Sequence, residues 1–132
     1  MLGRRMFLAL SLTAAAAAMS APAFADPAAV AFTPEAFKAA QAAGKPILVA
    51  IHASWCPTCK IQGVILKDLY KKPEFKDLTV FRVDFDAQKA IVAGFGADSQ
   101  STLIVFKGGK EMGRSVGDVS SASIEAMLKT AI

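Results

Sequence analysis

The only two cysteines of this 132-residue chain lie in one Cys-x-x-Cys sequence, Cys56-Pro57-Thr58-Cys59. A disulfide stabilises a fold mainly by restricting the unfolded chain, and the effect grows with the loop that the disulfide closes. A bridge between Cys56 and Cys59 encloses only Pro57 and Thr58, so it restricts almost nothing. The spacing therefore favours a pair that is reversibly oxidised and reduced over a structural cross-link.

The surrounding pattern also predicts how the pair reacts. We expect Cys56 at the N-terminus of a helix over residues 57–70, where unpaired backbone N–H groups favour the thiolate and lower the pKa of the thiol. The Cys56 thiolate would attack a substrate disulfide and form a mixed disulfide. Cys59, one helical turn further on, would then release the reduced substrate. In reverse, the same pair donates its disulfide.

Three other polar residues are candidates for a role beside the pair. His52, the only histidine, shares a strand face with positions 48 and 50, so it is either a packed strand residue, a proton acceptor or a ligand. Lys60 either favours the thiolate or is a solvated helix residue, because exposed charges interact weakly. Water, His52 and Asp84 remain open as acceptors of the Cys59 proton.

Alternating strand and helix signals surround the pair. The apolar run at 47–53 has the pattern of a strand covered on both faces. The helix that follows carries its apolar residues on one side, namely Ile61, Val64, Ile65, Leu66 and Leu69. Thr33 and Ser120 are predicted N-caps of two further helices.

The expected order of elements defines the fold class. We expect a short strand near 30–32, a helix from Pro34 to a stop at Gly44, a strand at 47–53, helix 57–70, a strand at 78–86, a helix at 87–95, a hairpin of strands at 102–106 and 111–116, and a helix after Ser120. This alternation predicts an α/β domain whose central sheet is covered by helices on both faces.

The first 25 residues have the pattern of an export signal. Arg4 and Arg5 form a short basic head, an apolar stretch follows at 7–19, and Ala23-Phe24-Ala25 supplies the small residues that a signal peptidase accepts. We expect cleavage before Asp26, one domain at 26–132 and a periplasmic location. An uncleaved membrane anchor is the alternative, and the paired arginines fit either the Tat or the Sec route.

With these elements in place, the chain resembles the thioredoxin family. The residues that carry the resemblance are Trp55-Cys56-Pro57-Thr58-Cys59-Lys60 after Pro46-Ile47-Leu48-Val49, then Val83, Asp86, Thr102-Leu103-Ile104-Val105-Phe106-Lys107-Gly108-Gly109 and Gly117. The resemblance covers nearly all of 26–132. It implies a thioredoxin fold, a mixed β-sheet flanked by helices, and a thiol–disulfide oxidoreductase, with reduction of protein disulfides favoured over oxidation. It also implies substrate contacts at Trp55, Pro57, Thr58, Ser101 and Thr102.

Three features depart from the family's pattern. Ala50 stands where thioredoxins have a buried aspartate, Ser101 stands where they have a cis-proline, and Pro57-Thr58 differs from the family's usual dipeptides. A non-proline cis peptide costs about 2.5–4 kcal/mol. We therefore expect a trans bond before Ser101 and an altered or more open substrate groove.

The resemblance and the export signal together imply the partners. We expect a monomer without a cofactor that exchanges disulfides with exported client proteins and with a membrane or periplasmic redox donor. Without Arg4 and Arg5 the formal net charge falls from +4 to +2, and the charges are interspersed, so nothing indicates nucleic acid. The alternative is a module in which Cys56 and Cys59 bind a metal or an iron–sulfur cluster, across a dimer because two thiolates are half of a usual ligand set.

Overall fold

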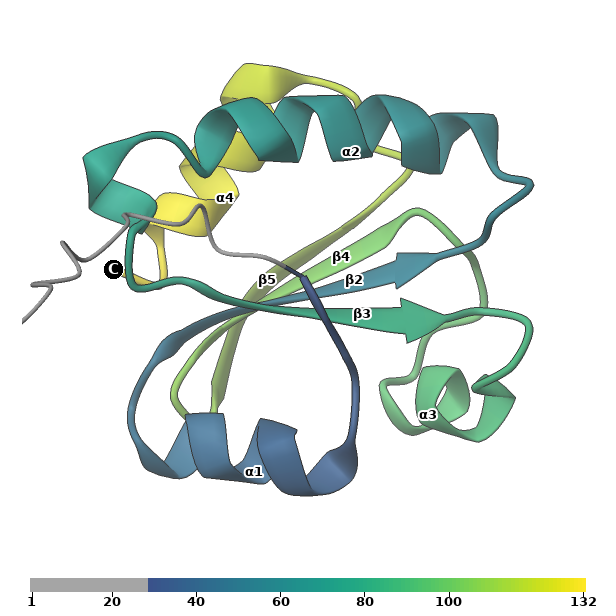
Figure 1. Cartoon of the computed structure of the whole chain (residues 1–132), viewed down its shortest axis with the longest axis horizontal. Coiled ribbons are helices and arrows are strands. Elements are labelled where there is room, and N and C mark those ends of the chain that lie inside the picture. The colour runs from purple at the N-terminus through teal and green to yellow at the C-terminus, as the bar shows by residue number, and fades with distance from the viewer. Residues whose placement is uncertain (1–28) are drawn as a thin grey trace, which may run out of the picture.

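The computed structural model describes residues 29–132 (Figure 1). The predicted export signal at 1–25 and its cleavage site lie outside these residues. Within the described part, none of the helices has the length and apolar character that crossing a bilayer requires.

Five strands form one mixed sheet in the order β1-β3-β2-β4-β5. Their bounds are Val30–Ala31 for β1, Pro46–His52 for β2, Thr79–Asp84 for β3, Thr102–Lys107 for β4 and Lys110–Val116 for β5. Strand β3 runs parallel to β1 and β2, whereas β4 is antiparallel to both β2 and β5. The central position of β2 explains its nearly unbroken apolar sequence, because both of its faces are covered.

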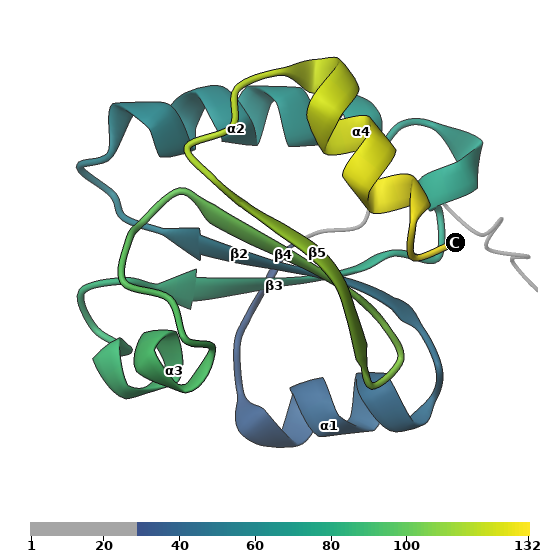
Figure 2. The same cartoon turned by 180° about the vertical axis from the view of Figure 1, so that it is seen from behind.

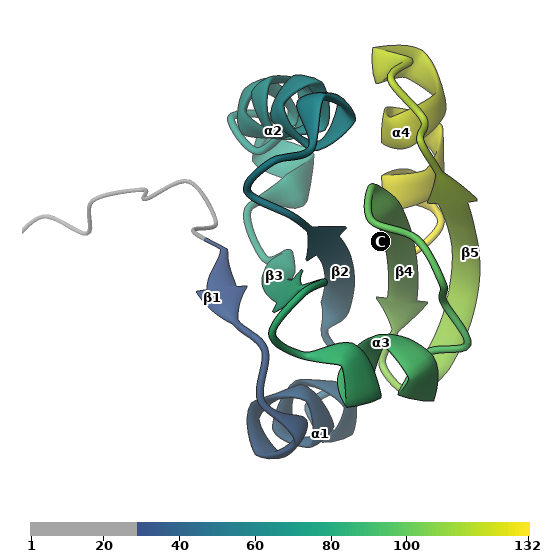
Figure 3. The ribbon, with the colours of Figure 1, turned by 90° about the vertical axis from the view of Figure 1, so that its right-hand side faces the viewer.

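Helices cover both faces of the sheet, as predicted. The α-helices within residues 29–132 are α1 (Pro34–Ala42), α2 (Pro57–Leu69), α3 (Lys89–Gly94) and α4 (Ser121–Lys129), and a 3₁₀ turn follows α2 at Pro73–Phe75. In Figure 3, α2 and α4 lie on one side of the strands and α1 and α3 on the other. The pair α2 and α4 is seen from behind in Figure 2. The predicted fold class is confirmed.

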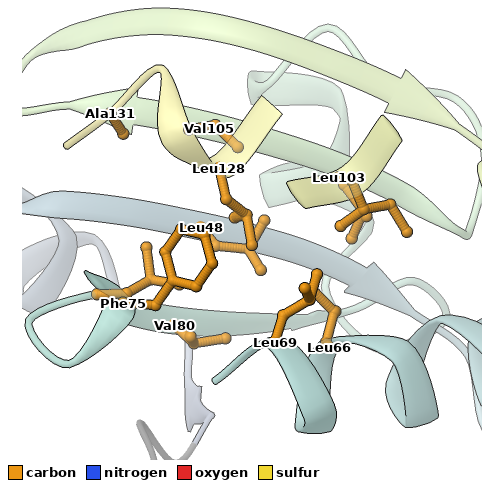
Figure 4. Packing of buried hydrophobic residues seen from close by; sticks show 11 residues of the cluster. Leu48, Leu66, Leu69, Phe75, Val80, Leu103, Val105, Leu128 and Ala131 are labelled. Atoms are coloured by element: carbon orange, nitrogen blue, oxygen red, sulfur yellow. The ribbon is translucent and has the colours of Figure 1, made fainter. Parts of the chain in front are cut away.

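Each face of the sheet has its own apolar core. Under α2 and α4, Leu48 of β2 meets residues of both helices and of the 3₁₀ turn, including Leu66, Phe75 and Leu128 (Figure 4). The opposite face holds a cluster of aromatic rings with centroids 5.2–6.1 Å apart, formed by Phe32, Phe37, Phe81, Phe95 and Phe106. These two cores fix β2 in the middle of the molecule, and a three-residue segment joins the end of β2 to Cys56.

The helix starts follow the capping chemistry expected from the sequence. The Thr33 hydroxyl accepts a hydrogen bond from the Ala36 N–H at 3.2 Å, and the Ser120 hydroxyl accepts one from the Ser123 N–H at 3.3 Å. Gly44 ends the first helix with a φ of 70°, a conformation that glycine adopts without a Cβ penalty.

The structure corrects the predicted buried face of α2. Ile61 and Val64 are 52% and 66% exposed, and the fully buried residues of the helix are Cys59, Gln62, Leu66 and Leu69. These four follow the helical repeat at i, i+3, i+7 and i+10, so Ile61 and Val64 point outward once Cys59 points inward.

Two predicted elements, the third helix and the strand before it, were longer than the structure shows. Helix α3 begins at Lys89 rather than 87, and β3 ends at Asp84 rather than 86. The cause is a local turn in which the Asp84 carboxylate accepts hydrogen bonds from the N–H groups of Asp86 and Ala87, both at 2.9 Å. A side chain that bonds to its own backbone in this way competes with continued strand or helix.

Candidate active site

Cys56 is the N-cap residue of α2 and is separated from the end of β2 at His52 by Ala53, Ser54 and Trp55. Its extended backbone, with φ −84° and ψ 112°, turns the chain into the helix, and Pro57 occupies the first helical position. The Cys56 sulfur accepts a hydrogen bond from the Cys59 N–H at 3.1 Å. The predicted place of this sulfur, among backbone N–H groups at a helix start, is therefore confirmed.

Ser101 lies against both sulfurs. Its hydroxyl oxygen is 3.1 Å from the Cys56 sulfur and 3.2 Å from the Cys59 sulfur. The peptide bond before Ser101 is trans, as predicted, but its φ of 62° was not foreseen, and Ser101 is the only non-glycine residue with a positive φ within 29–132. The serine thus occupies the place of the family's cis-proline with a different backbone and with a polar group turned toward the cysteines.

Three hydrogen bonds hold the Ser101 backbone in this conformation. Its N–H donates to the Ile51 carbonyl at 2.9 Å, and its carbonyl accepts from the Gly117 N–H at 3.0 Å and from the Gln62 amide at 3.1 Å. The Gln62 amide also donates to the Asp118 carbonyl at 2.9 Å. Sequence reasoning missed Gln62; the signal was a polar residue three positions after Cys59, on the face of the helix that Cys59 occupies.

Of the two alternatives, an altered or a more open groove, the structure shows an altered backbone with buried sulfurs. Cys56 is 1% exposed and Cys59 is 4% exposed, and Ser101 is itself buried. Burial of Cys56 acts to raise its pKa, but hydrogen bonds from the Cys59 side chain, from the Ser101 hydroxyl and from the N–H groups of Cys59 and Thr58 outweigh that effect. The pKa of Cys56 is therefore below the ordinary value for a thiol.

The other predicted substrate contacts separate into exposed and buried side chains. Trp55 is 56% exposed, and its indole N–H donates to the Asp86 carboxylate at 2.7 Å. Pro57 is exposed and Thr58 is half-buried. Thr102 is different, because its side chain is buried and its hydroxyl donates to the Ser99 carbonyl at 2.6 Å. The Thr102 side chain is therefore bonded within the protein, and a substrate contact at Thr102 stays a prediction for its backbone.

His52 lies on the same face of β2 as Ala50, as expected from the strand repeat. Both residues line a small cavity of about 30 Å³ together with Cys59, Gln62 and Arg82. Burial lowers the pKa of His52 and the nearby Arg82 lowers it further, while Asp84 opposes both. These effects favour the neutral ring of His52, in which one nitrogen can accept a proton.

Two further candidates, Asp84 and Lys60, lie at the start of a turn and on an exposed helix face. The Asp84 carboxylate caps the turn after β3, where it accepts the two N–H bonds given above. Lys60 is exposed on α2. Among residues 29–132, no group of three or more histidine, cysteine or acidic side chains is close enough to hold a metal ion.

Comparison with known proteins identifies the family. The family model described as Thioredoxin matches residues 28–130. The chain belongs to the thioredoxin family. A thioredoxin from Chlamydia muridarum is 41% identical over 71 residues, which are 54% of this chain and 68% of the relative. A thioredoxin from Mycobacterium tuberculosis is 35% identical over 80 residues, 61% of this chain and 68% of the relative.

A solved structure agrees with this assignment. Trxlp from Edwardsiella tarda is 43% identical and superimposes with a TM-score of 0.71, covering 74% of this chain and 94% of its own. The predicted thioredoxin fold is confirmed. With Cys56 and Cys59 in the family's Cys-x-x-Cys spacing, the chain is a thioredoxin-family thiol–disulfide oxidoreductase.

Proposed function

We propose that this protein reduces disulfides of exported client proteins, with Cys56 as the nucleophile and Cys59 as the resolving thiol. The observation that carries the proposal is the position of the Cys56 sulfur at the start of α2, 3.1 Å from both the Cys59 nitrogen and the Ser101 hydroxyl oxygen. The helix N-terminus and these contacts favour the thiolate, which is the attacking species in disulfide exchange.

The exchange balances without a cofactor. The Cys56 thiolate attacks one sulfur of the client disulfide, forms a mixed disulfide and expels the other client sulfur as a thiolate. Cys59 then attacks Cys56 and expels the second client sulfur, so the pair is oxidised by two electrons and the client disulfide is reduced. A separate donor, membrane-bound or periplasmic, returns the pair to the dithiol.

Exposed apolar side chains near the pair support a protein client. Trp55 lies next to Cys56 in the sequence and is 56% exposed. Val116 and Val119, which flank the Gly117 N–H bonded to the Ser101 carbonyl, are 61% and 48% exposed. Large exposed apolar groups are typical of surfaces that contact other proteins. We propose that a monomer presents this surface to an extended client segment.

Two cysteine variants test the chemistry. Purified 26–132 is assayed for reduction of insulin disulfides with dithiothreitol as donor. Cys56→Ser is expected to abolish the activity, and Cys59→Ser is expected to trap a mixed disulfide with the client. A Lys67→Ala variant, changed at an exposed position of the same helix, serves as the control. If Cys56→Ser retains full activity, the assignment is wrong.

Direction and location need separate measurements. A reduction potential near thioredoxin's −270 mV, measured in thiol buffers, supports a reductant, whereas a value near −120 mV would make the protein an oxidant. The N-terminal sequence supports export to the periplasm. Cell fractionation of the full chain and of a chain lacking 1–25 tests this, and replacing Arg4 and Arg5 by lysine separates the twin-arginine route from the general one.

A further inference from the structure

The Ser101 hydroxyl lies within hydrogen-bond distance of both cysteine sulfurs. A serine hydroxyl has one hydrogen to donate and lone pairs to accept with. The Ser101 hydroxyl lies 3.1 Å from the Cys56 sulfur and 3.2 Å from the Cys59 sulfur. It can therefore donate to only one of the two sulfurs at a time, and it can accept from the other.

The direction of the two bonds follows from the charge on Cys56. As a thiolate, Cys56 only accepts, and it already accepts from the Cys59 N–H at 3.1 Å. The Ser101 hydroxyl then donates to Cys56, and the one hydrogen of the Cys59 thiol is directed either to Cys56 or to the Ser101 oxygen. We propose that Ser101 is a catalytic residue whose hydroxyl stabilises negative charge first on Cys56 and then, after rotating, on Cys59.

The rotation is tied to the two steps of the exchange, so this inference rests on the proposed function. Attack by Cys56 forms the mixed disulfide, expels one client thiolate and leaves the Cys56 sulfur neutral. The Ser101 hydroxyl is then free to donate to Cys59, whose proton passes to water or to the His52 ring across the small cavity. The Cys59 thiolate forms a bond to Cys56 and breaks the Cys56–client bond. The protons released by the two cysteines match those taken up by the two client thiolates.

The backbone of Ser101 supports a role for its side chain. Its φ of 62° lies in the left-handed region, where the other described positive-φ residues are all glycines. A side chain in that region is strained, and such strain persists only where surrounding contacts impose it. Here the contacts are the hydrogen bonds to Ile51, Gly117 and Gln62, and the result is a hydroxyl oriented toward the reacting sulfurs.

The test separates the two steps with a small aromatic disulfide, dithiobis-nitrobenzoate. Reduced protein releases one coloured thiolate when Cys56 attacks and a second when Cys59 resolves the mixed disulfide. Ser101→Gly removes the hydroxyl and suits the left-handed backbone, so it is expected to fold. We expect both phases to slow by about tenfold or more, because a hydrogen bond to a charged group is lost in each step.

Controls distinguish this role from a structural one. Ser101→Ala also lacks the hydroxyl but keeps the backbone strain, so it should match Ser101→Gly in both phases while differing in unfolding midpoint. Ser99→Ala removes a hydroxyl from the same loop that donates to the Gln100 carbonyl, and it should leave both phases unchanged. The pH midpoint for alkylation of Cys56 should rise by about one unit in both Ser101 variants.

Two results would overturn the inference. If both phases are unchanged in Ser101→Gly, the hydroxyl has no catalytic part. If only the first phase slows, the hydroxyl serves Cys56 alone and does not follow the charge to Cys59. Neither assay uses a client protein. A wild-type protein that shows both phases but does not reduce insulin would therefore contradict the proposed function and leave the role of Ser101 intact.

Discussion

Replacing Gln62 by leucine tests whether the helix that carries the cysteines is tied to Ser101 as the structure indicates. Gln62 is 3% exposed, and its amide donates to the carbonyls of Ser101 at 3.1 Å and Asp118 at 2.9 Å. Leucine has a similar volume, so the substitution removes both donors without opening a large cavity. The Ser101 carbonyl keeps its bond from Gly117, whereas the Gln62 bond to the Asp118 carbonyl is lost.

The expected loss of stability follows from these two bonds. A typical hydrogen bond contributes about 0.5–1.5 kcal/mol net, so losing two lowers the free energy of unfolding by about 1–3 kcal/mol. Domains of this size have about 5–15 kcal/mol in total. With a urea dependence of about 1–3 kcal/mol per molar, the midpoint of equilibrium unfolding should fall by about 1 M. Circular dichroism of the reduced protein in urea measures this shift.

Function should change along with stability. Because Gln62 helps to hold Ser101 in its left-handed conformation, Gln62→Leu should also slow the release of the second aromatic thiolate. Lys67→Leu, at an exposed position of the same helix, is the matched control and should move the urea midpoint very little. If Gln62→Leu is as stable as the Lys67 variant and reacts like the wild type, then these hydrogen bonds do not organise the site.

Three further outcomes are expected. The pKa of Cys56 is lower in the folded than in the unfolded chain, so the reduced protein should gain stability as pH rises from the folded pKa to about 8.5. This stability is lost as pH falls back through the folded pKa. In urea titrations, Cys56→Ser should flatten this dependence of stability on pH. Phe37→Ala should cost about 2–4 kcal/mol in the same assay, because this half-buried ring contacts four others. Ala50→Asp should place a carboxyl group in the cavity beside Cys59 and Arg82, speed the second thiolate release and destabilise the fold by about 1–3 kcal/mol.

The sequence was sufficient to predict the helices and strands and the position of the cysteines at a helix start, because interactions between residues close in the sequence determine both. The Thr33 and Ser120 caps, the apolar run of β2 and the proline after Cys56 each act within a few residues of chain. Such signals do not depend on which other segments pack nearby, so the elements that they predict are found in the folded chain. The predicted order of strands and helices was right for the same reason.

The predictions that failed depended on tertiary contacts. The apolar residues Ile61 and Val64 indicated a helix but not which side of it would be covered, and that choice follows from Cys59 pointing inward. The conformation of Ser101 is imposed by partners far away in sequence, including Gln62 and Gly117. No local sequence pattern around a serine predicts a left-handed backbone that is stabilised by three hydrogen bonds to distant residues.

The combination of Ala50 and Ser101 changes how charge is handled at the cysteines. A buried carboxylate can take the proton of the resolving thiol. Before it does so it is ionised, and burial makes the ionised form costly. A hydroxyl is neutral in both steps and needs no such cost, yet it cannot keep a proton and can only direct its own hydrogen toward one sulfur or the other. The Ser101 hydroxyl therefore stabilises the thiolate without acting as the base, and the proton of Cys59 has to leave by way of water or the His52 ring across the small cavity. A carboxylate at position 50 and the hydroxyl at 101 would both act on the Cys59 sulfur, so the effects of Ala50→Asp and Ser101→Gly on the second thiolate release should not add in free energy, and a double-mutant cycle measures their coupling.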